Sequence, residues 1–282
     1  MRRHHLVELE DLEFTPAVLR NGLTNFLTVA IRIGAYYDEA VPMLADAVKR
    51  THDDRIVDLC SGAGGPWPVI FSRFQQLHPG LRVFLSDYHP NEDAMLASRK
   101  HQEGIEAVGR SVDATNVPAE LTGFRTFFTS FHHFRPEQAR KILADAVAKR
   151  QGIAIFECTE RSWRGLLWMS LSAFGVWFLT PFIRPVSWAA LFLTYIVPII
   201  PLMVTFDGVI SCLRTYTVAE LRQLAAGLGN DYTWDAGQVK GPRSPVPLTF
   251  LIGTPRTAED IGPNLRGERR LPAIRSQSPD RL

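Results

Sequence analysis

Short apolar runs alternate with longer amphipathic stretches through the middle of the chain. The stretches, such as residues 136–147, repeat apolar residues at helical spacing, whereas the runs are short enough to be buried strands. Strands that alternate with helices predict right-handed crossovers and a parallel sheet, so the expected fold is of the α/β class. The predicted strands lie at 55–57, 81–86, 106–112, 124–130 and 152–156.

The flanking segments extend this fold at both ends. Residues 1–50 are predicted to form an N-terminal helical cap, and 51–256 the main domain. Two further strands, at 232–239 and 246–252, complete the sheet. Residues 257–282 are polar and interrupted by prolines, which predicts a flexible tail.

A hydrophobic insertion, residues 163–206, follows the fifth strand. Residues 165–183 and 186–206 contain no charged side chain, and each run is about long enough to cross a bilayer. Their prolines and glycines argue against a simple span. Three interpretations stay open: a helical hairpin in a membrane, a lid over an apolar substrate, or core or homodimer interface. The first two imply an apolar or amphipathic substrate.

A glycine-rich loop follows the first strand. Asp58 closes the strand, Gly62 and Gly64 follow, and Pro66 is suited to open a helix because its missing N–H is not needed there. Glycines let the backbone approach a ligand closely. In a dinucleotide-binding fingerprint the third glycine would stand where this chain has Trp67, so a nicotinamide-dependent oxidoreductase is disfavoured.

Two more carboxylates follow later strands of the predicted sheet. Asp87 closes the second strand, and Asp113 follows the third. Together with Asp58 they lie at one edge of the sheet, where open α/β folds bind ligands.

The loop Asp58-x-Cys60-x-Gly62-x-Gly64 resembles the acidic-x-Gly-x-Gly-x-Gly loop of the class I S-adenosylmethionine-dependent methyltransferases. The run Ser130-Phe-His-His-Phe134 resembles the fourth motif of many small-molecule methyltransferases. The resemblance covers about residues 53–160. Cysteine at position 60 and the Pro-Trp-Pro after the loop depart from the family pattern.

This resemblance implies a Rossmann-like, seven-stranded, mostly parallel sheet with S-adenosylmethionine as cofactor. It places Asp58 at the methionine ammonium, Asp87 at the ribose hydroxyls and Asp113 at the adenine amino group. The full expected cofactor set is Asp58, Cys60, Ser61, Gly62, Gly64, Asp87, Tyr88, Asp113, Ala114 and Ser130.

The acceptor side is expected at the end of the fourth strand. His132 and His133 are candidate bases for a hydroxyl acceptor, with His133 preferred, because histidine titrates near neutrality. A purely cleft-shaping role for both stays open. The candidate acceptor-binding residues are Tyr36, Asp207, Arg214 and Tyr216, with a structural Asp207–Arg214 ion pair as the alternative.

The charge and the cysteine content limit the classes of partner that the protein is expected to bind. A net charge of +2 argues against nucleic acid, which requires a clustered basic face. The three cysteines have no metal-ligand spacing and are expected to be reduced core thiols, so no metal is predicted. No secretory signal is recognisable, so a cytoplasmic location is expected, with membrane contact through 165–206 open.

Methyl transfer to a small, apolar or amphipathic acceptor is therefore the predicted function. An RNA methyltransferase remains an alternative, since its loop is similar, although no Pro-Cys catalytic pair is present. A membrane-associated cofactor-binding protein without turnover is the non-enzymatic alternative.

Overall fold

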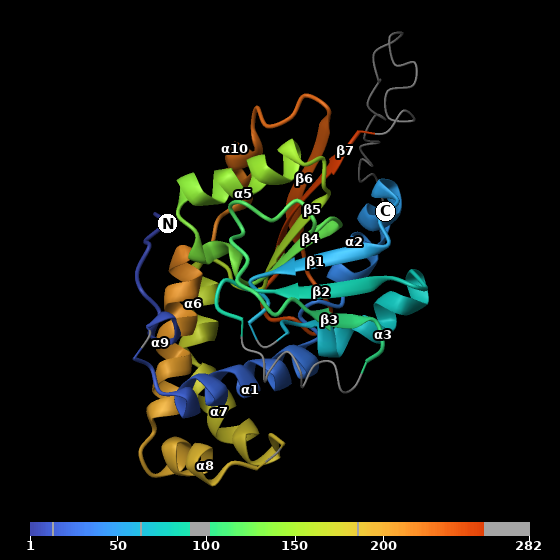
Figure 1. The fold of residues 1–282 in the computed structure, drawn as a ribbon. Coiled ribbons are helices and arrows are strands. Elements are labelled where there is room, and N and C mark those ends of the chain that lie inside the picture. Colours follow the sequence, from blue (N-terminus) through green and yellow to red (C-terminus); the bar gives the residue numbers. More distant parts are fainter. Residues whose placement is uncertain (13, 63, 91–101, 185, 257–282) are drawn as a thin grey trace, which may run out of the picture.

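A seven-stranded sheet forms the centre of the molecule (Figure 1). The computed structural model describes residues 1–12, 14–62, 64–90, 102–184 and 186–256, so the predicted tail 257–282 lies outside the described residues. The strand order is β3-β2-β1-β4-β5-β7-β6. The strands are β1 (Arg55–Leu59), β2 (Arg82–Ser86), β3 (Ile105–Ala107), β4 (Phe124–Phe128), β5 (Ile153–Glu157), β6 (Tyr232–Val239) and β7 (Leu248–Pro255).

The pairing of these strands confirms the predicted sheet. β1 pairs in parallel with β2 and β4, and β4, the central strand, pairs in parallel with β5. β7 runs antiparallel to both β5 and β6. This strand order, with β7 reversed, is that of the class I methyltransferase fold. The carboxyl ends of β1, β2, β4 and β5 consequently meet at one edge.

Helices cover both faces of the sheet and one of its ends. α2 and α3 lie on one face, α5 and α10 on the other, and α1 packs with α7, α8 and α9 beyond the edge (Figure 1). The helices are η1 (Leu9–Asp11), α1 (Ala17–Gly34), α2 (Ala40–Thr51), α3 (Trp67–Leu77), η2 (Phe131–His133), α5 (Pro136–Ala148), α6 (Trp163–Ser170), α7 (Ser172–Leu179), η3 (Thr180–Phe182), α8 (Trp188–Tyr195), α9 (Ile199–Arg214) and α10 (Val218–Ala225).

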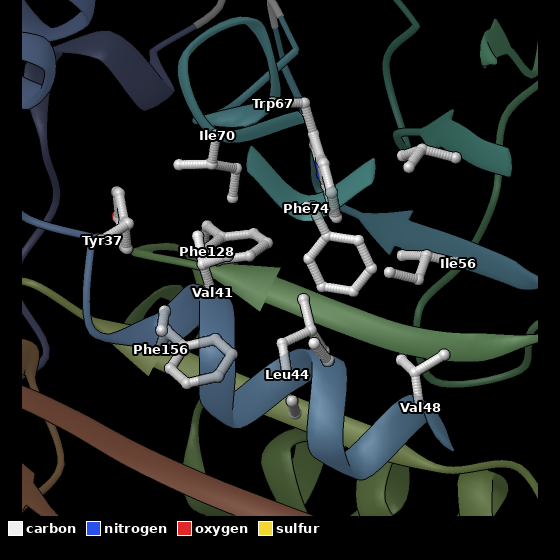
Figure 2. Packing of buried hydrophobic residues seen from close by; sticks show 14 of the residues in the cluster. Tyr37, Val41, Leu44, Val48, Ile56, Trp67, Ile70, Phe74, Phe128 and Phe156 are labelled. Atoms are coloured by element: carbon white, nitrogen blue, oxygen red, sulfur yellow. The ribbon is translucent and has the colours of Figure 1, made fainter. Parts of the chain in front are cut away.

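The largest core lies between α2, α3 and the sheet (Figure 2). Trp67, at the start of α3, is fully buried there. Its ring meets Phe74 and Phe128 edge-on at centroid distances of 6.0 and 5.6 Å. The indole that takes the place of a third glycine therefore fills the core below the loop.

Several predicted boundaries differ from those in the structure, and two of the differences are informative. β3 ends at Ala107 rather than at residue 112, because the polar, partly exposed residues 109–111 do not continue the ladder. α9 continues to Arg214, beyond the expected end of the insertion at 206. Asp207 and Arg214 find partners in the N-terminal segment, so the helix runs on through both polar residues.

The insertion leaves much apolar surface uncovered. The helical run Trp163–Phe182 is long and apolar enough to cross a membrane, with a mean hydropathy of 1.4 and 17% of it buried. α8 and α9 meet the same criteria only as a pair bent by 76°.

Replacing Trp67 with alanine tests the packing of the core between α2, α3 and the sheet. The cavity should lower the free energy of unfolding by about 3–5 kcal/mol. The matched control is Trp163→Ala, since this indole is 81% exposed and its loss should change stability by about 0.5 kcal/mol or less. Urea unfolding of the three proteins measures both values. Equal midpoints for the two variants would contradict this packing.

Candidate functional site

Asp58 lies beneath the glycine-rich loop rather than at its surface. The side chain is 1% exposed. Its Oδ2 accepts a hydrogen bond from Ser61 Oγ at 2.7 Å, and its Oδ1 accepts one from Thr126 Oγ1 at 2.6 Å. Asp58 is thus buried and already hydrogen-bonded within the protein, and its predicted contact with the methionine ammonium stays a prediction. The carboxylate holds the loop against β4.

The loop backbone adopts left-handed conformations at several positions. Gly62, Gly64 and Gly65 have φ of +52°, +105° and +53°. A Cβ built on Gly62 would meet nothing within 4 Å, so the loop faces open space there. Cys60, where the family has glycine, has φ of +58° and carries a cost of about 1–2 kcal/mol. Burial raises the pKa of its thiol, which stays neutral.

Asp87 faces this loop from the end of β2. Its Oδ2 accepts the Gly62 N–H at 2.9 Å, and its Oδ1 accepts the His89 N–H at 2.9 Å. Each oxygen retains a lone pair for a ligand. Asp113 is exposed beyond β3, where its Oδ1 accepts from the backbone and hydroxyl of Thr115.

Of the remaining expected cofactor residues, Ser130 and Ala114 are buried and Tyr88 is exposed. Ser130 is buried at the end of β4, and its hydroxyl has no hydrogen-bond partner among the described residues. Tyr88 is exposed beside Asp87, whereas Ala114 is buried in the second core, which lies between the sheet, α5 and α10. An unpaired buried hydroxyl costs about 1–3 kcal/mol, so Ser130 is suited to meet a ligand.

His132 lies between two buried carboxylates. Its Nδ1 is 2.8 Å from Glu157 Oε2, and its Nε2 is 3.5 Å from Glu8 Oε1. Burial alone would lower the pKa of His132, but Glu157 and Glu8 outweigh it and raise the pKa to about 10. With these carboxylates as partners the ring is protonated at neutral pH. His132 therefore does not suit the role of general base.

His133 is the more open of the two. Its side chain is 26% exposed, and its Nδ1 lies 3.2 Å from Asp11 Oδ1. Its Nε2 lies 3.6 Å from Glu8 Oε2. Arg214 Nη1 reaches both acids, at 3.2 Å from Glu8 and 2.9 Å from Asp11. We call Glu8, Asp11, His132, His133, Glu157 and Arg214 the histidine–carboxylate cluster.

The predicted alternative of an Asp207–Arg214 ion pair is wrong. The two oxygens of Asp207 instead accept the backbone N–H groups of Leu9 at 2.7 Å and Glu10 at 3.1 Å. Asp207 thereby fixes the N-terminal segment on α9.

Tyr216 packs against Phe131 in the second core, and its hydroxyl donates to the Phe134 carbonyl at 2.8 Å. Neither Tyr216 nor Arg214 lines the pocket described next, so the structure does not bring these two expected acceptor residues to it. Arg214 instead forms ion pairs with Glu8 and Asp11 of the cluster.

A large pocket of about 900 Å³ opens beside the cluster. Glu8, His132, His133 and Asp207 lie at one end, and the expected acceptor residue Tyr36 lies on its wall. Most of the remaining lining comes from apolar side chains of α1, α6, α7 and α9. They include Leu23, Phe26, Leu27, Ile31, Trp168, Met169, Phe174, Leu179 and Val204.

Thr129, at the end of β4, lies on the pocket wall in a strained conformation. Its φ of +45° is rare for a β-branched residue. Its hydroxyl accepts the Cys158 N–H at 3.0 Å and is hydrogen-bonded to the Tyr37 hydroxyl. Strain of this kind persists where the surrounding contacts determine it, often at functional sites.

Sequence reasoning missed four groups at this site: Glu8, Asp11, Thr129 and Glu157. Glu157 follows the same strand-end pattern as Asp58 and Asp87, so that signal was present. Glu8 and Asp11 belong to a short acidic segment with no periodicity. Only the three-dimensional fold brings them to His132 and His133.

No protein-family model matches the sequence, and no curated protein matches it either. Among solved structures, the plantazolicin methyltransferase BpumL in complex with SAH is 12% identical, with 84% of this chain and 98% of that one covered and a TM-score of 0.45. An O-methyltransferase family protein from Burkholderia thailandensis is 15% identical over 82% of this chain and 59% of that one, with a TM-score of 0.43. Human N-acetylserotonin methyltransferase in complex with SAM is 14% identical over 91% and 63%, with a TM-score of 0.48. The chain spans about three fifths of the length of the latter two.

Asp58 should make the stability of the protein depend on pH. Burial, partly offset by the hydrogen bonds from Thr126 and Ser61, raises its pKa to about 6. The folded state thus holds the proton more tightly than the unfolded chain, so this stabilisation is present below pH ~4 and is lost as the pH rises through about 6. The loss amounts to about 3 kcal/mol at about 1.4 kcal/mol per pKa unit.

Asp58→Asn should remove this dependence. The free energy of unfolding of the variant minus that of the wild type should therefore rise by about 3 kcal/mol between pH 4 and 7. Denaturant titrations at each pH measure the difference. Asp54→Asn, at a side chain that is 83% exposed, is the control and should show no such trend. A constant difference for Asp58→Asn would contradict the prediction.

Proposed function

We propose that this protein transfers a methyl group from S-adenosylmethionine to an apolar or amphipathic acceptor in the pocket. One observation carries the proposal: the predicted cofactor loop and the apolar pocket share a wall. Ser61, Gly65 and Pro66 of the loop segment line the pocket, as does Thr129 at the end of β4. A cofactor on the loop would therefore meet an acceptor in the pocket.

The residues at the loop fit the cofactor. Gly62 faces open space, Asp87 offers a carboxylate suited to a ribose diol, and the buried Ser130 hydroxyl lacks a partner. Asp113 is exposed at the neighbouring strand end, in reach of an adenine bound there. When bound, the cofactor supplies an electrophilic methyl group on a sulfonium.

The protein itself positions the acceptor, keeps water away from the reacting atoms and removes the proton of the acceptor. The pocket excludes water by its apolar walls and holds the acceptor against the end of β4. His133 lines the pocket, and Asp11 orients its ring through Nδ1. For a hydroxyl acceptor, His133 stays our candidate for receiving the proton.

The same insertion supplies a surface that we assign to a lipid bilayer. The apolar face is the set of exposed apolar side chains from α6 to α9, and so many of them on one segment mark an interaction surface. Its members include Trp163, Leu167, Phe174, Phe178, Phe182, Trp188, Phe192, Ile196 and Leu202.

Charge and aromatic content favour a membrane over a second copy of the chain. Residues 163–206 contain two exposed arginines, Arg164 and Arg184, and no acidic residue, which suits anionic headgroups. Tryptophans are enriched where proteins meet the membrane–water interface, and Trp163 and Trp188 are among the most exposed side chains here. We therefore propose peripheral docking at the cytoplasmic side, with the acceptor entering the pocket from the lipid.

Asp87→Ala should weaken S-adenosylmethionine binding by about 1–3 kcal/mol, because a charge-assisted hydrogen bond is lost. Isothermal titration calorimetry measures the affinity. Asp54→Ala, before β1 and thus at the opposite end of the strands, is the control and should bind normally. Gly62→Val should bind no cofactor, since φ of +52° disfavours a branched residue. Normal affinity in both site variants would reject the cofactor assignment.

The apolar face should bring the protein to anionic liposomes. Full-length protein should float with phosphatidylcholine–phosphatidylglycerol vesicles, and Trp163→Ser with Phe178→Ser and Trp188→Ser should abolish flotation. Each large side chain contributes about 1.5–3 kcal/mol when fully buried in apolar surroundings. Phe14→Ser with Leu77→Ser, two exposed apolar side chains on other elements, is the control. If the protein forms a dimer in solution and does not float with the vesicles, the apolar face is a self-association surface instead.

A further inference from the structure

Glu8, His132 and His133 form a compact set of ligand atoms at the end of the pocket. One carboxylate oxygen and one nitrogen from each ring lie within 4.8 Å of one another. The individual separations are 3.5 Å between Glu8 Oε1 and His132 Nε2, and 3.6 Å between Glu8 Oε2 and His133 Nε2. Ligands about 2.0–2.1 Å from a tetrahedral zinc ion lie roughly 3.3–3.4 Å apart, so little movement would be needed.

The orientation of both rings matches that of metal-binding histidines. A ligating histidine almost always donates its other ring N–H to a carboxylate or carbonyl. Here the Nδ1 atom of His132 faces Glu157 at 2.8 Å, and the Nδ1 atom of His133 faces Asp11 at 3.2 Å. The Nε2 atoms of both rings are thereby turned toward Glu8.

A buried polar atom without a partner points into the same space. His132 is 1% exposed, and its Nε2 has no hydrogen-bond partner among the described residues. A buried nitrogen in this condition costs about 1–3 kcal/mol unless another group satisfies it. A metal ion at the centre of the three ligands would do so.

The charges around the three ligands also suit a divalent cation. Glu8, Asp11 and Glu157 are acidic, and Arg214 is the basic group that faces Glu8 and Asp11. Metal binding would release the ring proton that His132 holds in the metal-free protein. With both imidazoles neutral, these four charged groups sum to two negative charges, and Asp207 lines the same pocket. Arg214 lowers the affinity for a cation but also fixes the orientation of the ligating carboxylate.

The geometry points to a binding site for a divalent transition-metal ion, of which zinc is the type, on Glu8, His132 and His133. Two histidines and one carboxylate leave a coordination position open, as in catalytic sites. Because His132, His133 and Glu8 line the pocket, that position faces the acceptor. The metal role rests on the proposed function and changes one step of it: a metal-bound His133 would not receive the proton. The ion would instead bind the acceptor oxygen and lower the pKa of its hydroxyl, so that the proton leaves to water.

Zinc binding can be tested without cofactor or acceptor. Full-length, untagged protein is stripped with a chelator and dialysed against Zn²⁺, and its metal content is measured by mass spectrometry. We expect one zinc ion per chain, a higher unfolding temperature with Zn²⁺, and visible absorption bands of a Co²⁺-loaded sample. Neither S-adenosylmethionine nor the acceptor is present in this experiment. A protein that binds no zinc would therefore not contradict the proposed methyl transfer, and a protein that binds no cofactor would not contradict the metal site.

Four variants connect the ion to these residues. Glu8→Gln and His133→Asn should lose zinc and the rise in unfolding temperature. Asp11→Asn, which removes only the carboxylate behind His133, should weaken zinc binding about 10–100-fold. His52→Asn is the control, since this histidine ends α2 outside the cluster, and it should retain one ion. The metal site would be overturned if the wild-type protein binds no zinc or cobalt, or if all four variants bind zinc equally. The negative charge of the cluster would then be offset by bound protons.

Discussion

The hydrogen-bonded contact of Glu157 with His132, continued to Glu8, is the interaction on which the arrangement of this molecule depends. It joins the end of a central strand to η2 and to the eighth residue of the chain. All three side chains are almost completely buried, and a buried charge without its partner costs several kcal/mol. Removing one member would therefore leave the others unbalanced, so the N-terminal segment, η2 and β5 are held together as one unit.

The position of the insertion follows from this unit. Asp207 and Arg214 on α9 bind the N-terminal segment through Leu9, Glu10, Glu8 and Asp11. α6, α7 and α8 in turn pack on α9, and α1 closes the bundle through Leu23 and Phe26. The apolar helices are thus attached to the domain by buried charges at one end, while many of their remaining apolar side chains are exposed.

The sheet could be predicted because its signals are local. Each strand is a short apolar run, and the glycine loop, the strand-end acids and the last two strands are all readable from neighbouring residues. The cluster could not be predicted, because Glu8, His132 and Glu157 are far apart in the sequence and share no pattern. Asp58 illustrates the other limit: its position at a strand end was readable, but its burial beneath the loop depends on Ser61 and Thr126.

The pocket has a polar end and an apolar wall, and this contrast determines which kind of acceptor would fit it. Charged and polar groups gather at the end formed by Glu8, His132, His133 and Asp207, whereas α1 and α7 supply an apolar wall. A uniformly apolar molecule would leave the buried polar groups without partners, and a uniformly polar one would leave the apolar wall in contact with water. An amphipathic acceptor satisfies both ends at once. Under the proposed function, the polar group of the acceptor would lie at the end formed by Glu8, His132, His133 and Asp207, and its apolar part would extend along the wall formed by α1 and α7.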